Sequence, residues 1–203
     1  CAVLALALWL VIGTQETVAD ALRLAAFNVT SIITTTGYAT ADYGIWGPFA
    51  VVLFFVLTFV GGCTGSTVGA VKIFRFEIMG RVVVLLLRRL QYPHGIFPPT
   101  YMGKRVDTDV MSGVIAFFAL FVASFVALSL LLGFAGLDFV TAVSGAATAI
   151  GNVGPGLGPI IGPAGNFSSL PDVAKWLLAG GMLLGRLEIF TVLVLLLPSF
   201  WRP

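Results

Sequence analysis

Residues 34–39 read Thr34-Thr35-Thr36-Gly37-Tyr38-Ala39, and residues 152–156 read Asn152-Val153-Gly154-Pro155-Gly156. Each of these two polar loops follows a helix-compatible stretch too short to cross a bilayer, and longer apolar segments flank both. A potassium filter is an extended strand of backbone carbonyls that replace the water around the ion, and glycine allows the backbone conformation that aims them. Ion conduction is therefore the leading hypothesis. The alternative is a pair of ordinary surface turns, which would have no reason to recur at the same place in a repeated hydropathy pattern.

The composition indicates a membrane protein, since 59% of the residues are hydrophobic and 10% are charged, against about 25% charged residues in soluble domains. Seven of the eleven basic residues lie between residues 72 and 105. The positive-inside rule places that stretch in the cytoplasm and the two polar loops on the outer side. We expect the basic face to meet lipid headgroups or a cytosolic subunit, because no nucleic-acid signature accompanies it.

The order helix, half-helix, filter, helix occurs twice in the same orientation. The predicted half-helices cover residues 17–33 and 138–150, and the full spans that follow or precede them include 46–60, 110–132 and about 173–197. We therefore predict an all-α integral membrane protein of two parallel repeats. Its units are residues 1–91, a cytoplasmic linker at 92–109, and residues 110–203. The opening run lacks an initiator Met and is shorter than the roughly 20 residues of a spanning helix, so we expect a piece of a longer chain.

A second interruption, which we call the glycine loop, covers residues 61–69 (Gly61-Gly62-Cys63-Thr64-Gly65-Ser66-Thr67-Val68-Gly69). Gly61, Gly65 and Gly69 are four residues apart, a spacing that also suits close helix packing. Four glycines and three hydroxyls within nine residues nevertheless disfavour a continuous helix. The sequence predicts local unwinding.

Arg186 lies near the middle of the last predicted span. A charge there costs several kcal/mol unless it faces water or a partner. Arg186 therefore either faces the pore or forms an ion pair with Glu188. Residues two apart point to different helix faces, which favours a pore-facing Arg186 with Glu188 bracing a neighbour.

Thr35-Thr36-Gly37-Tyr38-Ala39 matches the potassium filter pattern Thr-x-Gly-Tyr-Gly except at its last place, and the second polar loop keeps both glycines. The chain resembles the Trk/Ktr/HKT superfamily of potassium and sodium transporters over nearly its whole length. That superfamily surrounds one filter with four helix–pore-helix–helix units, and this chain is similar to the third and fourth. The resemblance is most specific at residues 35–39, 61–72 and 152–158 and at Gly185-Arg186-Leu187-Glu188.

The resemblance implies potassium uptake across the inner membrane of the cell. The filter residues would be Thr35, Thr36, Gly37, Tyr38, Asn152, Val153 and Gly154, with potassium bound at all of these except Tyr38. The gate would comprise Gly61, Gly62, Gly65, Ser66, Gly69 and Arg186. The implied partners are the missing N-terminal pore units, a second copy of the subunit and a cytosolic nucleotide-binding regulatory subunit.

Enzymatic chemistry is not indicated. His94 is the one histidine, no nucleophile–base pair is evident, and no cofactor is expected beyond potassium as the substrate. Two alternatives stay open. Secondary transporters with broken helices often use inverted repeats, whereas these repeats are parallel; a non-conducting scaffold would need neither the polar loops nor Arg186.

Overall fold

The computed structural model describes residues 1–14, 16–63, 65–92, 100–101, 104–105 and 107–187, together with residues 191, 194, 200 and 201. The helices of this part of the chain are, in order, α1 (Ala2–Thr14), α2 (Val18–Ile33), α3 (Pro48–Thr58), α4 (Ile73–Gln91), α5 (Thr108–Phe134), α6 (Phe139–Gly151), α7 (Gly158–Ile161) and α8 (Asp172–Arg186). A 3-10 turn, η1 (Tyr43–Ile45), precedes α3, and two short strands, β1 (Thr100–Tyr101) and β2 (Lys104–Arg105), pair antiparallel between α4 and α5. Apart from this strand pair, the all-α prediction is confirmed.

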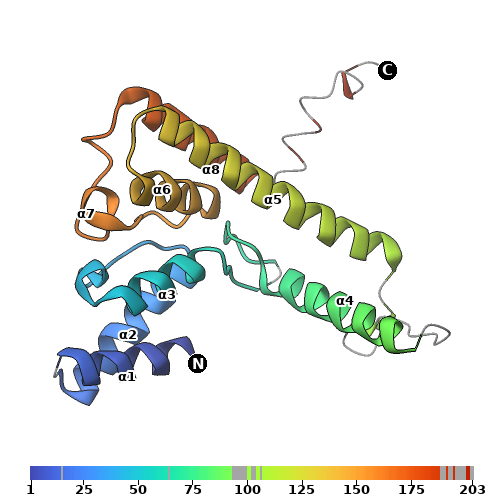
Figure 1. Cartoon of the computed structure of the whole chain (residues 1–203), viewed down its shortest axis with the longest axis horizontal. Helices are drawn as coiled ribbons and strands as arrows, with labels where there is room; N and C mark the ends of the chain where they lie inside the picture. Colours follow the sequence, from blue (N-terminus) through green and yellow to red (C-terminus); the bar gives the residue numbers. More distant parts are fainter. Residues whose placement is uncertain are drawn as a thin grey trace.

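The first group of helices consists of α1, α2 and α3, which pack together around one apolar core (Figure 1). The half-helix α2 begins at Thr17, whose hydroxyl accepts a hydrogen bond from the Asp20 backbone N–H at 3.2 Å. A threonine cap satisfies an otherwise unpaired N–H of the first turn, and the Asp20 carboxylate suits the positive end of the helix dipole. The ring of Tyr43 stacks on Phe54 with centroids 4.0 Å apart, which joins η1 to α3.

The second group is formed by α5, α6 and α8, with α6 packed against both longer helices (Figure 1). Small residues make this close packing possible. A side chain on Gly185 of α8 would come within 1.9 Å of the Ile150 carbonyl oxygen at the end of α6, so only glycine allows the two helices to approach here. The second half-helix is consequently buried from Thr141 to Gly151 except at Val143.

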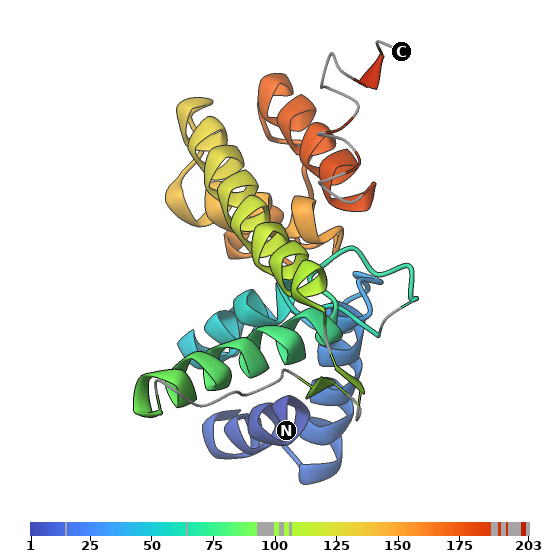
Figure 2. The ribbon, with the colours of Figure 1, turned by 90° about the vertical axis from the view of Figure 1, so that its right-hand side faces the viewer.

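The helix α4 connects the two groups and packs along α5 through Ile78, Val82 and Val114 (Figures 1 and 2). Between the end of α3 at Thr58 and the start of α4 at Ile73, the described residues contain no helix. The structure therefore has the predicted local unwinding of the glycine loop and not a continuous, closely packed helix.

Among the described helices, the segment Asp109–Phe134 of α5 is long and apolar enough to cross a membrane, while apolar segments of α1, α3 and α6 are shorter. The helix predicted over residues 110–132 extends from Thr108 to Phe134, and Asp107 and Asp109 suit the positive end of its dipole. The last predicted span is described as α8 up to Arg186. Glu188 and His94 lie outside the described residues.

Candidate functional site: two polar loops above a glycine loop

The first polar loop leaves the C-terminal end of α2 in an unusual backbone conformation. Thr35 has a φ of 55° and Gly37 a φ of 77°, both in the left-handed region. The Thr36 N–H donates to the Ser31 carbonyl oxygen at 2.9 Å, and the Gly37 N–H donates to the same oxygen at 3.4 Å. The loop therefore folds back against the last turn of its half-helix.

The second polar loop repeats this path at the end of α6. Asn152 has a φ of 52° and Gly154 a φ of 121°, at the positions that correspond to Thr35 and Gly37. The Val153 N–H donates to the Thr148 carbonyl oxygen at 3.1 Å, as Thr36 does to Ser31. Two sequences that share only a glycine thus adopt the same succession of backbone turns.

The two polar loops lie directly against each other. A side chain built on Gly37 would come within 2.3 Å of the Val153 carbonyl oxygen and 3.2 Å of Pro155 Cδ. The side chain of Val153 is buried in the core of the first helix group, although the residue belongs to the second. The structure therefore brings Gly37, Val153 and Gly154 together, although over a hundred residues separate them in sequence.

Other predicted residues of these loops are more open. The Tyr38 side chain is 71% exposed, so it does not pack behind the loop within the described chain. The Thr36 hydroxyl lies 2.6 Å from the Thr34 hydroxyl. The Asn152 side chain donates to the Met182 carbonyl oxygen of α8 at 3.0 Å.

Three buried polar residues that were not predicted from the sequence hold the polar loops, or the residues just after them, to the half-helices. Asn28 of α2 donates to the Thr40 hydroxyl at 3.0 Å and accepts from the Thr40 N–H at 3.3 Å. The Ser144 hydroxyl of α6 accepts from the Leu157 N–H at 3.0 Å, and the Thr148 hydroxyl accepts from the Gly154 N–H at 2.9 Å. The sequence does carry one signal, because a hydroxyl residue, Ser31 or Thr148, lies six positions before the loop glycine in each repeat.

Electrostatics at the polar loops come mainly from the half-helices. Both loops begin at helix C-terminal ends, where the helix dipole is negative and attracts cations. At the other end of α6, hydrogen bonds from Thr141 lower the pKa of the exposed Asp138 carboxyl. The resulting carboxylate caps the positive end of α6.

Backbone hydrogen bonds join the two ends of the glycine loop, and its last residue contacts the end of α6. The Gly61 N–H donates to the Val71 carbonyl oxygen at 2.8 Å, and the Ile73 N–H donates to the Gly62 carbonyl oxygen at 3.2 Å. Inside the loop, Ser66 donates through its hydroxyl to the Cys63 carbonyl oxygen at 2.6 Å. A side chain on Gly69 would come within 2.6 Å of the Gly151 carbonyl oxygen, so this residue touches the start of the second polar loop. Gly65 has a φ of 84° and lies at the open tip.

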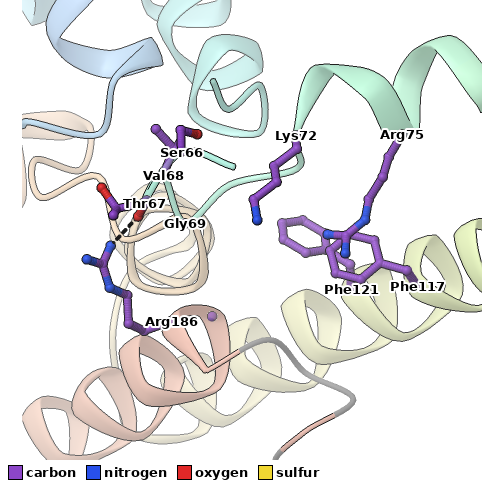
Figure 3. A pocket seen from close by; sticks show the side chains of 10 residues that line it. Ser66, Thr67, Val68, Gly69, Lys72, Arg75, Phe117, Phe121 and Arg186 are labelled. Carbon is purple, nitrogen blue, oxygen red and sulfur yellow. Dashed lines mark hydrogen bonds between the residues drawn. The ribbon is translucent and has the colours of Figure 1, made fainter. Parts of the chain in front are cut away.

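Arg186 reaches the glycine loop from the end of α8. Its Nη1 donates to the Thr67 carbonyl oxygen at 2.5 Å (Figure 3). The structure thus joins two sequence-predicted features, the loop and the arginine, that are 119 positions apart.

A cavity of about 250 Å³ opens beside this contact, lined by Ser66, Thr67, Val68, Gly69, Lys72, Arg75, Phe117, Phe121, Gly185 and Arg186. Lys72 and Arg75 enter it from the start of α4, and the Arg75 guanidinium lies 3.7 Å from the centre of the Phe117 ring (Figure 3). Cations predominate over this lining. Within the described residues there is no group of three or more His, Cys, Asp or Glu side chains that could hold a metal ion.

Comparison with known proteins identifies relatives of one kind. Residues 4–202 match the family model of TrkH, described as a cation transport protein. The chain is 55% identical over 201 residues to the Trk system potassium uptake protein TrkI of Halomonas elongata. The aligned region covers 98% of this chain and 40% of the relative. It is 36% identical over 178 residues to the Trk system potassium uptake protein TrkH of Escherichia coli, covering 88% of this chain and 36% of the relative.

The fold has a solved counterpart in the crystal structure of the potassium transporter TrkH from Vibrio parahaemolyticus. The two superpose with a TM-score of 0.91 at 37% sequence identity, over 99% of this chain and 42% of the other. The chain therefore spans about 40% of the length of the relatives that it matches.

Proposed function

The chain belongs to the TrkH family of cation transport proteins, which are membrane transporters and not enzymes, and from this we propose that its full-length protein takes up potassium ions through a filter of backbone carbonyls. The residues we assign to the filter are Thr35, Thr36, Gly37, Tyr38, Asn152, Val153 and Gly154. Potassium is the substrate, held at the first three and the last three of these.

The observation that carries the proposal is the contact between two polar loops with the same backbone path. In a trans peptide the N–H and the C=O point in opposite directions, and no described peptide bond is cis. Because the N–H groups of Thr36, Gly37 and Val153 point back to the half-helices, the preceding carbonyls point away from them. Carbonyls that turn away from the half-helices are available as the ligands that a dehydrated potassium ion needs.

The glycine loop and Arg186 supply the proposed gate. Gly61, Gly62, Gly65, Ser66 and Gly69 form an irregular segment whose end touches the second polar loop, and Arg186 is bonded to Thr67 of the same segment. A guanidinium on the inner side of a cation filter repels the permeant ion, most strongly where water is scarce. Separation of Arg186 from the loop would open the path.

The remaining pore units and the partner proteins of the proposed transporter lie outside this chain. We propose that residues 1–91 and 110–203 are two of four pore units, that the missing units precede residue 1, and that the basic segment between residues 72 and 105 faces the cytoplasm. The relatives' membership in Trk systems supports a cytosolic partner. By family resemblance, this partner binds nucleotide, and the pore subunit forms a dimer in the inner membrane.

The test is cation flux into proteoliposomes that contain the full-length protein, driven by an inside-negative voltage with equal potassium or sodium outside. We expect potassium to enter faster than sodium and both fluxes to exceed those of protein-free vesicles. Flux that requires an added proton or sodium gradient would instead identify a broken-helix secondary transporter. A folded protein without flux would identify a scaffold and contradict the proposal.

A further inference from the structure

One buried threonine accepts hydrogen bonds from two successive backbone amides of the second polar loop. Thr148 lies in the last turn of α6 with 1% of its surface exposed. Its carbonyl oxygen accepts from the Val153 N–H at 3.1 Å, and its hydroxyl accepts from the Gly154 N–H at 2.9 Å.

The second hydrogen bond fixes the plane of the peptide between Val153 and Gly154. Since this peptide is trans, an N–H held against Thr148 forces the Val153 carbonyl oxygen to the opposite side. That oxygen faces the first polar loop, where a side chain on Gly37 would come within 2.3 Å of it. Gly154 has no side chain to resist rotation of the plane, and the hydrogen bond to the Thr148 hydroxyl opposes that rotation.

The half-helix before the first polar loop has a hydroxyl at the corresponding position, but the Gly37 N–H does not donate to it. Ser31 occupies the place of Thr148, and its carbonyl oxygen accepts from both Thr36 and Gly37. The Ser31 hydroxyl is buried and makes no hydrogen bond among the described residues. The two loops therefore share a backbone path but differ in the group that holds the glycine amide.

We propose that Thr148 is a positioning residue for ion selectivity, which acts by keeping the Val153 carbonyl turned toward the ion path. This inference rests on the proposed filter function. Without the hydroxyl, the peptide plane can rotate and present the Gly154 N–H to the path in place of the carbonyl. An N–H repels a cation, and a site with fewer carbonyls discriminates potassium from sodium less well.

The experiment compares variants of the full-length protein in the same proteoliposome assay, normalised to folded protein. Thr148→Val keeps the shape of the side chain and removes the acceptor, whereas Thr148→Ser keeps the hydroxyl. We expect Thr148→Val to lower the potassium-to-sodium flux ratio by about two- to tenfold, the range that loss of one intramolecular hydrogen bond produces, and Thr148→Ser to restore most of it. Ser31→Ala is the matched control and should leave the ratio unchanged, because its hydroxyl is unpartnered in the described chain.

The outcomes separate the inference from the function on which it rests. If the unaltered protein carries no potassium or does not prefer it, the filter function fails. If the unaltered protein is selective and Thr148→Val retains its ratio, the positioning role is rejected. Should Thr148→Val fail to fold, Thr148→Cys is measured by the same criterion, since a thiol of similar size is a weak acceptor.

Discussion

Replacement of Gly37 by alanine should damage ion selectivity through two separate effects. The added Cβ would lie 2.3 Å from the Val153 carbonyl oxygen, whereas carbon and oxygen approach no closer than about 3.3 Å in favourable contacts. One of the two polar loops must therefore move by about 1 Å at the proposed ion site. In addition, the φ of 77° at this position costs an alanine about 1–2 kcal/mol.

Gly154→Ala separates these effects. Its Cβ would lie 3.6 Å from the Gly37 Cα, an ordinary contact, so this variant carries backbone strain of about 1–3 kcal/mol without a steric clash. Gly136→Ala is the matched control away from the loops, since Gly136 has a φ of 91° and, apart from its chain neighbours, no described residue has an atom within 4 Å of the added Cβ. It should lower stability and leave ion preference unchanged.

The assay is the ratio of potassium to sodium flux per folded protein in proteoliposomes. Because 1.4 kcal/mol corresponds to a factor of ten, we expect Gly37→Ala to lose selectivity by roughly tenfold or more, and Gly154→Ala to lose less. A Gly37→Ala protein with unaltered selectivity would refute the reasoning. So would a Gly154→Ala protein that is impaired more than Gly37→Ala, because the clash with Val153 would then be irrelevant.

Three further predictions test the gate and the orientation. Arg186→Ala removes the contact with Thr67 and should raise resting potassium flux, while Arg186→Lys should keep it low; reduced flux in a well-folded Arg186→Ala variant would reject the gate. Gly69→Ala places a Cβ 2.6 Å from the Gly151 carbonyl oxygen, so it should push the glycine loop away from α6 and raise flux, whereas Gly65→Ala at the open tip should raise it less. A cysteine-directed label should reach position 92 only from the cytoplasm and position 166 only from outside; the opposite pattern would overturn the assignment of the basic segment.

The local elements were predictable because their signals are local. Thr17 and Asp138 precede apolar runs as caps, and the structure begins α2 and α6 one residue after each of them. The break at the glycine loop was also predictable, since glycine and hydroxyl residues weaken a helix wherever they cluster. The start of α5 was misplaced by two residues because the apolar pattern begins only after Asp109.

Contacts between distant segments could not be predicted in the same way. Nothing in the first polar loop indicates that Gly37 meets the Val153 carbonyl, because that contact depends on how the two helix groups pack. Arg186 was identified from its cost in the membrane, but its acceptor, the Thr67 carbonyl, is a backbone atom that any residue provides. Thr148 was missed because a hydroxyl residue six positions before a loop glycine has no evident role until its hydrogen bond with Gly154 is known.

The positive φ angles at Thr35 and Asn152 indicate what the two polar loops have in common. Asparagine tolerates this conformation, but threonine is β-branched and pays roughly 1–2 kcal/mol for it. Strain of this kind persists only where the surroundings over-determine the backbone, as the hydrogen bonds from Thr36 and Gly37 to Ser31 do here. The side chains that follow are unrelated, since Tyr38 is largely exposed and Pro155 takes its place in the second loop. We therefore infer that the shared property of the two loops is the direction of their carbonyls, which different residues reach by the same backbone path.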